Sequence, residues 1–276
     1  MSSVFRIVPF LRPDSAALLG SVPPLDGIKE EPSLTLCSTD VFFPACGPLA
    51  RLVGTALRRS ATFARMQSHA SASGRSARWT SQLMWVGAGE VPAARYEWHV
   101  DRVGPGWHGS GGQEVADYSC NSDSADEDVA FGVVSYFWPD DETAPAAGLT
   151  TEFMLENLVV PVAGLVGDPR ELGDSISRCV GQLDHPARIA RHASDVLVWF
   201  SSRTLHRPPL ADRPGWRFFL RVGWYEDPCS PYADHRLACH RVYDVRSARC
   251  LYRPAGTLET LSAWSGPLSE PVSSCG

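Results

Sequence analysis

Two apolar runs in the last third of the chain constrain its fold most. Residues 196–200 are β-branched and aromatic, and residues 216–225 alternate between two faces, so both runs predict strands. Pro208, Pro209, Pro214 and Gly215 mark a loop between them, which predicts a β-hairpin. On the second run Arg217, Phe219 and Arg221 share one face, because alternate residues of a strand point the same way. The hairpin therefore carries two arginines and one aromatic ring on a single face.

The remaining pattern is mostly that of strands. Further strands are expected at residues 80–86, 94–100, 129–138 and 150–160, with loops about every ten residues. Helical periodicity predicts a helix at residues 48–66, and a second, short helix is expected at 169–180. Residues 68–78 are small and polar, which is typical of a mobile connection or lid. The pattern predicts an all-β core with peripheral helices, in the form of a double-stranded β-helix (a cupin-like jelly roll).

At 276 residues the chain is expected to form a single domain. Residues 1–79 are interpreted as an N-terminal elaboration with a helix and a flexible connection. Residues 80–225 are interpreted as the jelly-roll core, and residues 226–276 as a loop-rich C-terminal extension.

Composition excludes several classes of function. The net charge of −6 argues against binding a nucleic-acid backbone, which needs clustered positive charge. No apolar run reaches the roughly 18 residues of a membrane span, so no membrane association is expected. The eight cysteines include no Cys-x-x-Cys pair, and a cytoplasmic location is expected. The acidic run at 121–128 is interpreted as a solvated loop, with its role left open.

A His-x-Asp pair ends the expected strand at 94–100. Residues i and i+2 of a strand face the same side, so His99 and Asp101 can hold one cation together. With His206, at the join between the two expected strands of the hairpin, they make two imidazoles and one carboxylate. This is the facial triad that leaves coordination positions open on non-haem iron(II).

With these residues the chain resembles the iron(II)- and 2-oxoglutarate-dependent dioxygenases over roughly residues 80–225. The segment DVLVWFSSRTLHR is similar to the corresponding segment of the phytanoyl-CoA-hydroxylase-like or related small-molecule branches. The resemblance implies that His99, Asp101 and His206 are the metal ligands. It also implies that an arginine after His206 anchors the far carboxylate of 2-oxoglutarate. Arg217 is preferred because it is nearer the metal end of the hairpin, with Arg221 as the alternative or a second anchor.

Other site residues are less specific. Gln82, Trp85 and Thr151, on neighbouring strands, are candidates to complete the 2-oxoglutarate site. Trp85, His108 and Phe219 are candidate substrate contacts, although a solvent-exposed histidine and core aromatic residues are the alternative interpretations.

The resemblance implies hydroxylation of a C–H bond with dioxygen as oxidant and release of succinate and carbon dioxide. The expected substrate is a small molecule, such as a free amino acid or a natural-product intermediate. Asp101 favours hydroxylation, desaturation or cyclisation over halogenation, because family halogenases have a small residue there. The alternatives are a peptide or protein side-chain hydroxylase and a non-redox cupin-like protein that binds zinc or manganese. The oligomeric state is left open.

Overall fold

A large antiparallel sheet forms the centre of the protein, as seen in a computed structural model. The structure describes residues 3–7, 11–14, 31–72, 74–93, 96–100, 129–140, 142, 145–146, 149–162, 169–192, 196–226, 235–237 and 239–254. The strand order is β13 (His235–Arg236), β3 (Leu34–Ser38), β4 (Arg75–Val86), β12 (Gly215–Glu226), β6 (Val129–Pro139), β10 (Leu197–Ser201) and β2 (Leu11–Asp14).

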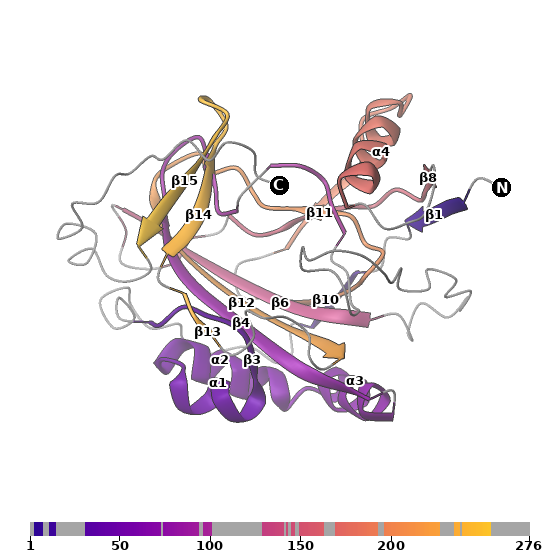
Figure 1. The fold of residues 1–276 in the computed structure, drawn as a ribbon. Coiled ribbons are helices and arrows are strands. Elements are labelled where there is room, and N and C mark those ends of the chain that lie inside the picture. The colour runs from indigo at the N-terminus through magenta and orange to yellow at the C-terminus, as the bar shows by residue number, and fades with distance from the viewer. Residues whose placement is uncertain are drawn as a thin grey trace.

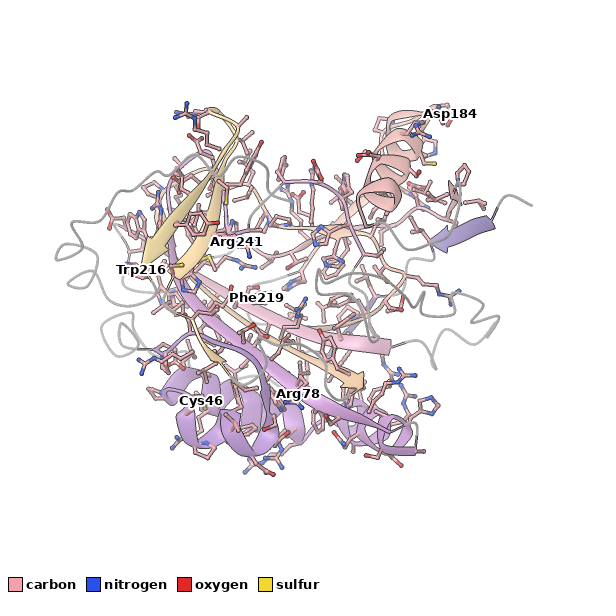
Figure 2. The ribbon with its side chains drawn as sticks, in the orientation of Figure 1. Cys46, Arg78, Asp184, Trp216, Phe219 and Arg241 are labelled. Carbon is pink, nitrogen blue, oxygen red and sulfur yellow. The ribbon has the colours of Figure 1, made fainter. Side chains whose placement is uncertain are left out.

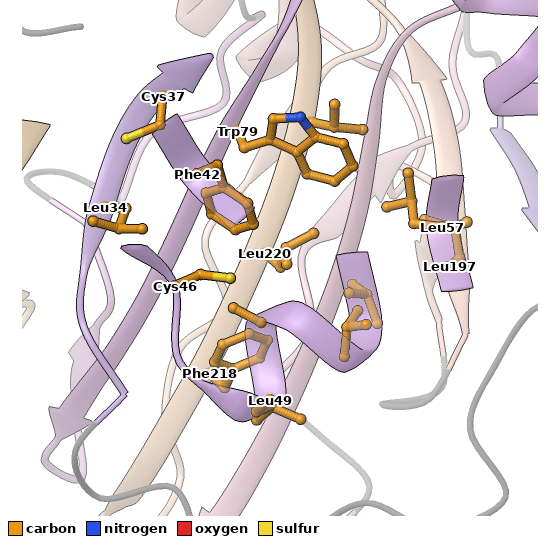
Figure 3. Close-up of a cluster of buried hydrophobic side chains, with 14 of the residues drawn as sticks. Leu34, Cys37, Phe42, Cys46, Leu49, Leu57, Trp79, Leu197, Phe218 and Leu220 are labelled. Atoms are coloured by element: carbon orange, nitrogen blue, oxygen red, sulfur yellow. The ribbon is translucent and has the colours of Figure 1, made fainter. Parts of the chain in front are cut away.

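Helices cover one face of this sheet: α1 (Thr39–Ala45), α2 (Pro48–Arg58) and α3 (Ala61–Ala72) (Figure 1). The α2 helix begins with proline, whose fixed φ suits a first helical turn. The buried carboxylate of Glu31 accepts hydrogen bonds from the backbone nitrogens of Leu49 (3.1 Å) and Ala50 (2.9 Å) at that end. Apolar side chains at helical spacing then pack with Trp79, Phe218 and Leu220 of the sheet (Figure 3).

Smaller strand groups lie on the opposite side of the large sheet (Figure 1). One group has the order β11 (His206–Arg207), β7 (Glu152–Met154), β9 (Ile189–Arg191). The others pair β1 (Ser3–Ile7) with β8 (Leu158–Val162), and order β15 (Arg249–Pro254), β14 (Cys239–Asp244), β5 (Glu90–Val91). The helix α4 (Pro169–Gly181) lies beside β8. Phe131, Phe153 and Phe200 pack between the large sheet and β7.

The expected hairpin is wrong, although both of its strands exist. β12 pairs with β4 and β6, and β10 pairs with β6 and β2, so β6 separates the two strands. The reason is that β6 is apolar on both faces: Val134 and Trp138 face the helices, whereas Phe131 and Val133 face the smaller sheet. A strand buried on both faces suits a central position in a sheet.

The β-rich core with peripheral helices is confirmed, and the helix at 169–180 is present as α4. The helix expected at 48–66 is two helices, because Ser60 Oγ accepts a hydrogen bond from Phe63 N (3.1 Å) and caps α3.

Three expectations about individual segments are wrong. The expected mobile connection at 68–78 is instead the end of α3 and the start of β4 in its described residues. Residues 96–100 form an isolated bridge and no regular strand, and residues 150–160 are divided between β7 and β8. In its described residues, the expected loop-rich extension at 226–276 also contains β13, β14 and β15, and Tyr243 and Asp244 pair with β5. Within the described ranges, the helices are all too short or too polar to cross a membrane.

Candidate active site

Two histidines far apart in the sequence form a pair where residues 96–100 meet β11. The backbone nitrogen of His99 donates to the carbonyl of His206 (3.0 Å), and the nitrogen of His206 donates to the carbonyl of His99 (2.9 Å). Residues directly opposite in an antiparallel pair point to the same face. The ring centroids are therefore only 4.5 Å apart, close enough for both imidazoles to bind one ion.

Backbone carbonyls orient both rings. His99 Nδ1 lies 2.9 Å from the carbonyl of Glu97, and His206 Nδ1 lies 3.0 Å from the carbonyl of Thr204. A carbonyl can only accept a hydrogen bond, so Nδ1 carries the hydrogen in each neutral ring and Nε2 carries the lone pair. Metal-binding histidines commonly have this arrangement, in which one ring nitrogen is fixed by an acceptor and the other ligates the metal.

Aromatic rings surround the deeper histidine. His206 is 6% exposed, and its ring centroid lies 5.1 Å from that of Phe200 and 6.1 Å from that of Phe153. The aromatic rings therefore give the His206 imidazole an apolar surrounding on this side.

The expected third ligand, Asp101, and the candidate substrate contact His108 lie outside the described residues. The parts of the chain that are described contain no group of three or more His, Cys, Asp or Glu residues placed to hold a metal. Two of the three expected ligands are thus brought together, and the third is not tested.

Arg217 is buried on the face of β12 that points away from the helices. It is 3% exposed, Nε donates to the carbonyl of Leu149 (3.0 Å), and Nη2 donates to Ser135 Oγ (3.2 Å). Its guanidinium carbon lies 4.8 Å from the ring centroid of Phe219. Leu149 has a φ of 53°, in the left-handed region, so a strained backbone presents this carbonyl.

In the described part of the chain, the charge of Arg217 is not matched by an acid. Among the described residues its partners are a carbonyl, a hydroxyl and an aromatic ring, and none is a carboxylate. Burial lowers the pKa of Arg217 to about 9, so the side chain still carries its charge at neutral pH. A buried charge with neutral partners is costly, and a bound anion would offset that cost.

Arg221 shares this face of β12 and is partly exposed. Its guanidinium carbon lies 5.5 Å from the ring centroid of Phe131, and that ring packs on Phe200 beside His206. Ring contacts through Phe131 and Phe200 thus connect Arg221 to His206, and the choice between Arg217 and Arg221 as the anchor stays a prediction. The sequence argument for Arg217 rested on the hairpin, and that premise fails because β6 lies between β10 and β12.

The other expected site residues divide between the two faces of the sheet. Gln82 is half-buried directly opposite Phe219, on the same face as Arg217. Figure 2 shows Phe219 on the side of the sheet away from Cys46, which follows the helix α1. Thr151 is buried between Leu149 and β7. Trp85 instead packs on Trp216 (ring centroids 5.7 Å apart) in the helix-facing core, which argues against its expected contact with substrate.

Sequence reasoning missed the two residues that hold Arg217. Ser135 had a weak signal, because its hydroxyl interrupts the apolar and aromatic run of β6. Leu149 had none, because it contributes through its backbone carbonyl.

Comparison of the chain with family models, curated proteins and solved structures gives no match. A function has to be inferred from the residues themselves.

Proposed function

We propose that the protein is an iron(II)- and 2-oxoglutarate-dependent oxygenase that hydroxylates a C–H bond of a small molecule. The observation that carries this proposal is the buried Arg217, without an acidic partner in the described residues, on the sheet face that also packs toward an imidazole pair. Phe219 links the two, since it contacts Arg217 and packs against the cluster of Phe153 and Phe200 that surrounds His206.

The fold supports this assignment. A double-stranded β-helix faces a large antiparallel sheet with a smaller one and holds its site between them. Here β12 and β6 of the large sheet lie opposite β11 and β7, with aromatic side chains between. We therefore propose the jelly-roll fold as the finer description of the β-rich core.

His99, His206 and Asp101 would hold the metal. The fit rests on the imidazole pair, whose Nδ1 atoms are both engaged by carbonyls and whose Nε2 atoms carry the lone pairs. Two neutral imidazoles and a carboxylate are a donor set suited to iron(II) with open coordination positions. When bound, iron(II) with 2-oxoglutarate and dioxygen supplies the chemistry that hydroxylates a C–H bond, with release of succinate and carbon dioxide.

Arg217 would bind the far carboxylate of 2-oxoglutarate. Its planar guanidinium suits a carboxylate, and Leu149 and Ser135 fix the direction in which it points. Gln82 and Thr151 remain candidates for a further polar contact, because both lie beside this face.

Burial of the site supports a small-molecule substrate. His206 and Arg217 are 6% and 3% exposed, so a reacting group must enter the interior to reach them. Phe131, Phe153 and Phe200 would exclude water from the reacting atoms. An extended peptide or protein side chain is the alternative substrate. A non-redox metal-binding protein is the alternative function, but it assigns no role to the charge of Arg217.

The dicarboxylate assignment can be tested by titration calorimetry of the manganese(II)-loaded protein with 2-oxoglutarate. Arg217→Met should weaken binding about 100-fold, the cost of removing one partner of a buried charge-assisted pair. Arg221→Met, the matched control on the same strand face, should change the affinity less than about fivefold, since partly exposed ion pairs contribute little. Unchanged affinity in Arg217→Met would refute the assignment, and a reversed order would make Arg221 the anchor.

A further inference from the structure

The smaller sheet carries a row of side chains on its outer face, behind the histidine pair. The register pairs His99 with His206, Arg207 with Glu152, and Glu152 with Arg191. Trp98 therefore lies opposite Arg207. Since neighbouring residues of a strand point to opposite faces, these outer side chains stand directly behind the inner ones. The outer row is Trp98, Arg207, Glu152 and Arg191, and the inner row is His99, His206, Phe153 and Ala190.

Glu152 fixes Arg207 in this row. Its side chain is 2% exposed, and Oε2 accepts a hydrogen bond from Arg207 Nε (2.7 Å). The other oxygen, Oε1, accepts hydrogen bonds from Arg191 Nε (2.7 Å) and Nη2. A carboxylate held from both sides in this way leaves the guanidinium of Arg207 little freedom to move.

The guanidinium of Arg207 stacks on both aromatic rings of the segment at 96–100. Its carbon lies 4.5 Å from the ring centroid of Tyr96 and 4.4 Å from that of Trp98. Such distances are typical of cation–π contacts, and these are partly desolvated because Arg207 is 19% exposed. Arg207 thus grips two alternate residues on the outer face, next to His99 on the inner face.

These contacts of Arg207 act on a segment that has little backbone pairing. In its described residues, the segment at 96–100 joins β11 by an isolated bridge and forms no regular strand. A slip of one residue would turn His99 to the outer face, because side chains alternate. Besides the two backbone hydrogen bonds of the bridge, Val100 and Leu205 are buried in one apolar cluster and add apolar contact.

We propose that Arg207, anchored by Glu152, is a positioning residue for the metal-binding histidines. By clamping Tyr96 and Trp98 it holds the register that places the His99 ring beside the His206 ring. The inference rests on the proposed function insofar as these imidazoles bind a metal.

The test compares Arg207→Met, which keeps the length but removes the charge, with Arg207→Lys, which keeps a cation. Arg213→Met is the matched control, because Arg213 makes an ion pair with Glu142 (2.7 Å) in a different part of the molecule. Manganese(II) affinity is measured by electron paramagnetic resonance. Hydrogen exchange of the His99 and His206 amides is measured in the metal-free proteins, together with the melting temperature.

Arg207→Met should bind manganese(II) about tenfold or more weakly, the usual effect of losing a residue that orients metal ligands. Its two histidine amides should exchange faster, whereas those of the Arg213→Met control should match the wild type. Arg207→Lys should recover part of both losses, because an ammonium group also stacks on aromatic rings. The melting temperature of Arg207→Lys should stay near that of the wild type, which separates positioning from general stability.

Wild-type affinity and wild-type exchange in Arg207→Met would overturn the inference. Loss of binding without faster exchange, or without any recovery in Arg207→Lys, would also overturn it. If the wild type itself binds no manganese(II) while Arg207→Met still exchanges faster, the proposed function fails and the register role of Arg207 stands. If Arg207→Met folds poorly, Tyr96→Leu removes one stacking partner with the Glu152 ion pair intact. Tyr96→Leu should show smaller changes in manganese(II) affinity and amide exchange in the same direction. Wild-type values in this variant would contradict the positioning role of Arg207.

Discussion

Arg217 places a positive charge where the protein gains little from it without a ligand. The side chain is 3% exposed and has a carbonyl, a hydroxyl and a ring as its described partners. Removing a charge from water costs several kcal/mol, and hydrogen bonds to neutral groups only partly offset this cost. A binding site that keeps such a charge sacrifices stability for function.

This trade-off predicts that Arg217→Met raises the free energy of unfolding of the unliganded protein by about 1 kcal/mol, while it weakens 2-oxoglutarate binding. Methionine fills a similar volume without a charge and can pack beside Phe219. Urea unfolding of both proteins without ligand measures the difference. A loss of stability of more than about 1 kcal/mol would instead mean that Arg217 has a structural role.

His240 is a second buried titratable residue, and it makes the stability depend on pH. Its ring is 3% exposed, Nε2 lies 2.9 Å from Ser33 Oγ, and burial lowers the pKa of His240 to about 4. The unfolded residue titrates near 6.5, so between these values the unfolded chain binds a proton that the folded chain does not. The contribution of neutral His240 is therefore present above pH 6.5 and is lost as the pH falls toward 4.

Between pH 7.5 and pH 5, His240 should account for a loss of about 2 kcal/mol in the free energy of unfolding. The loss should be smaller by that amount in His240→Gln, as measured by urea unfolding at the two pH values. His185→Gln, at a half-exposed position, is the control for removal of a histidine as such. Equal losses in all three proteins would contradict the assignment to His240.

At the scale of single residues, the sequence was sufficient to predict site residues whose side-chain type and spacing carry the signal. His99 and His206 do lie together, and Arg217 is buried on the expected face of its strand. It was not sufficient for partners that act through the backbone, such as the carbonyls of Leu149, Glu97 and Thr204. It also could not place Trp85, because an aromatic residue suits either face of a buried strand.

Among the elements, β12 is the most constrained, because it is hydrogen-bonded on both sides over most of its length. Its first residue, Gly215, has no room for a side chain: a Cβ there would lie 2.3 Å from the backbone oxygen of Trp138. That oxygen belongs to the neighbouring strand β6 and cannot rotate away as a side chain would. Any larger residue must therefore push β12 and β6 apart, two residues from Arg217.

Gly215→Ala should lower the free energy of unfolding by about 2 kcal/mol, as overpacking does in a tight core, and should also weaken 2-oxoglutarate binding. Gly173→Ala in α4 is the matched control, because nothing lies within 4 Å of a Cβ at that position. It should raise stability by about 0.5–1 kcal/mol, because alanine is the better helix former. Chemical denaturation of both variants checks the pair, and similar effects in the two would contradict the packing described for Gly215.

Strand and helix positions were largely predictable from local pattern, whereas strand neighbours were not. The runs at 129–138 and 216–225 read correctly as strands because β-branched and aromatic residues fill them. Their order in the sheet depends on contacts between distant residues, and the apolar character of both faces of β6 was the available but unused signal. Residues 96–100 lack strand pairing because they meet β11 at one bridge, which no local propensity encodes.

For the whole molecule, the arrangement places α1, α2 and α3 on one face of the large sheet and the candidate site on the other. The helix-facing core supplies the main apolar packing, so residues on the opposite face can include Arg217 and Arg221 without loss of the fold. The same division places Arg217 on a long central strand, whereas His99 lies at an isolated bridge and His206 on the two-residue strand β11.

The central claim is that the imidazole pair and Arg217 together bind iron(II) and 2-oxoglutarate. Its most direct test is the visible absorption spectrum of the protein with iron(II) and saturating 2-oxoglutarate, recorded without oxygen. We predict the weak charge-transfer band of a chelated complex, present in the wild type and in Arg221→Met and absent in His206→Ala. A wild-type protein that binds iron(II) yet shows no such band would contradict the oxygenase proposal.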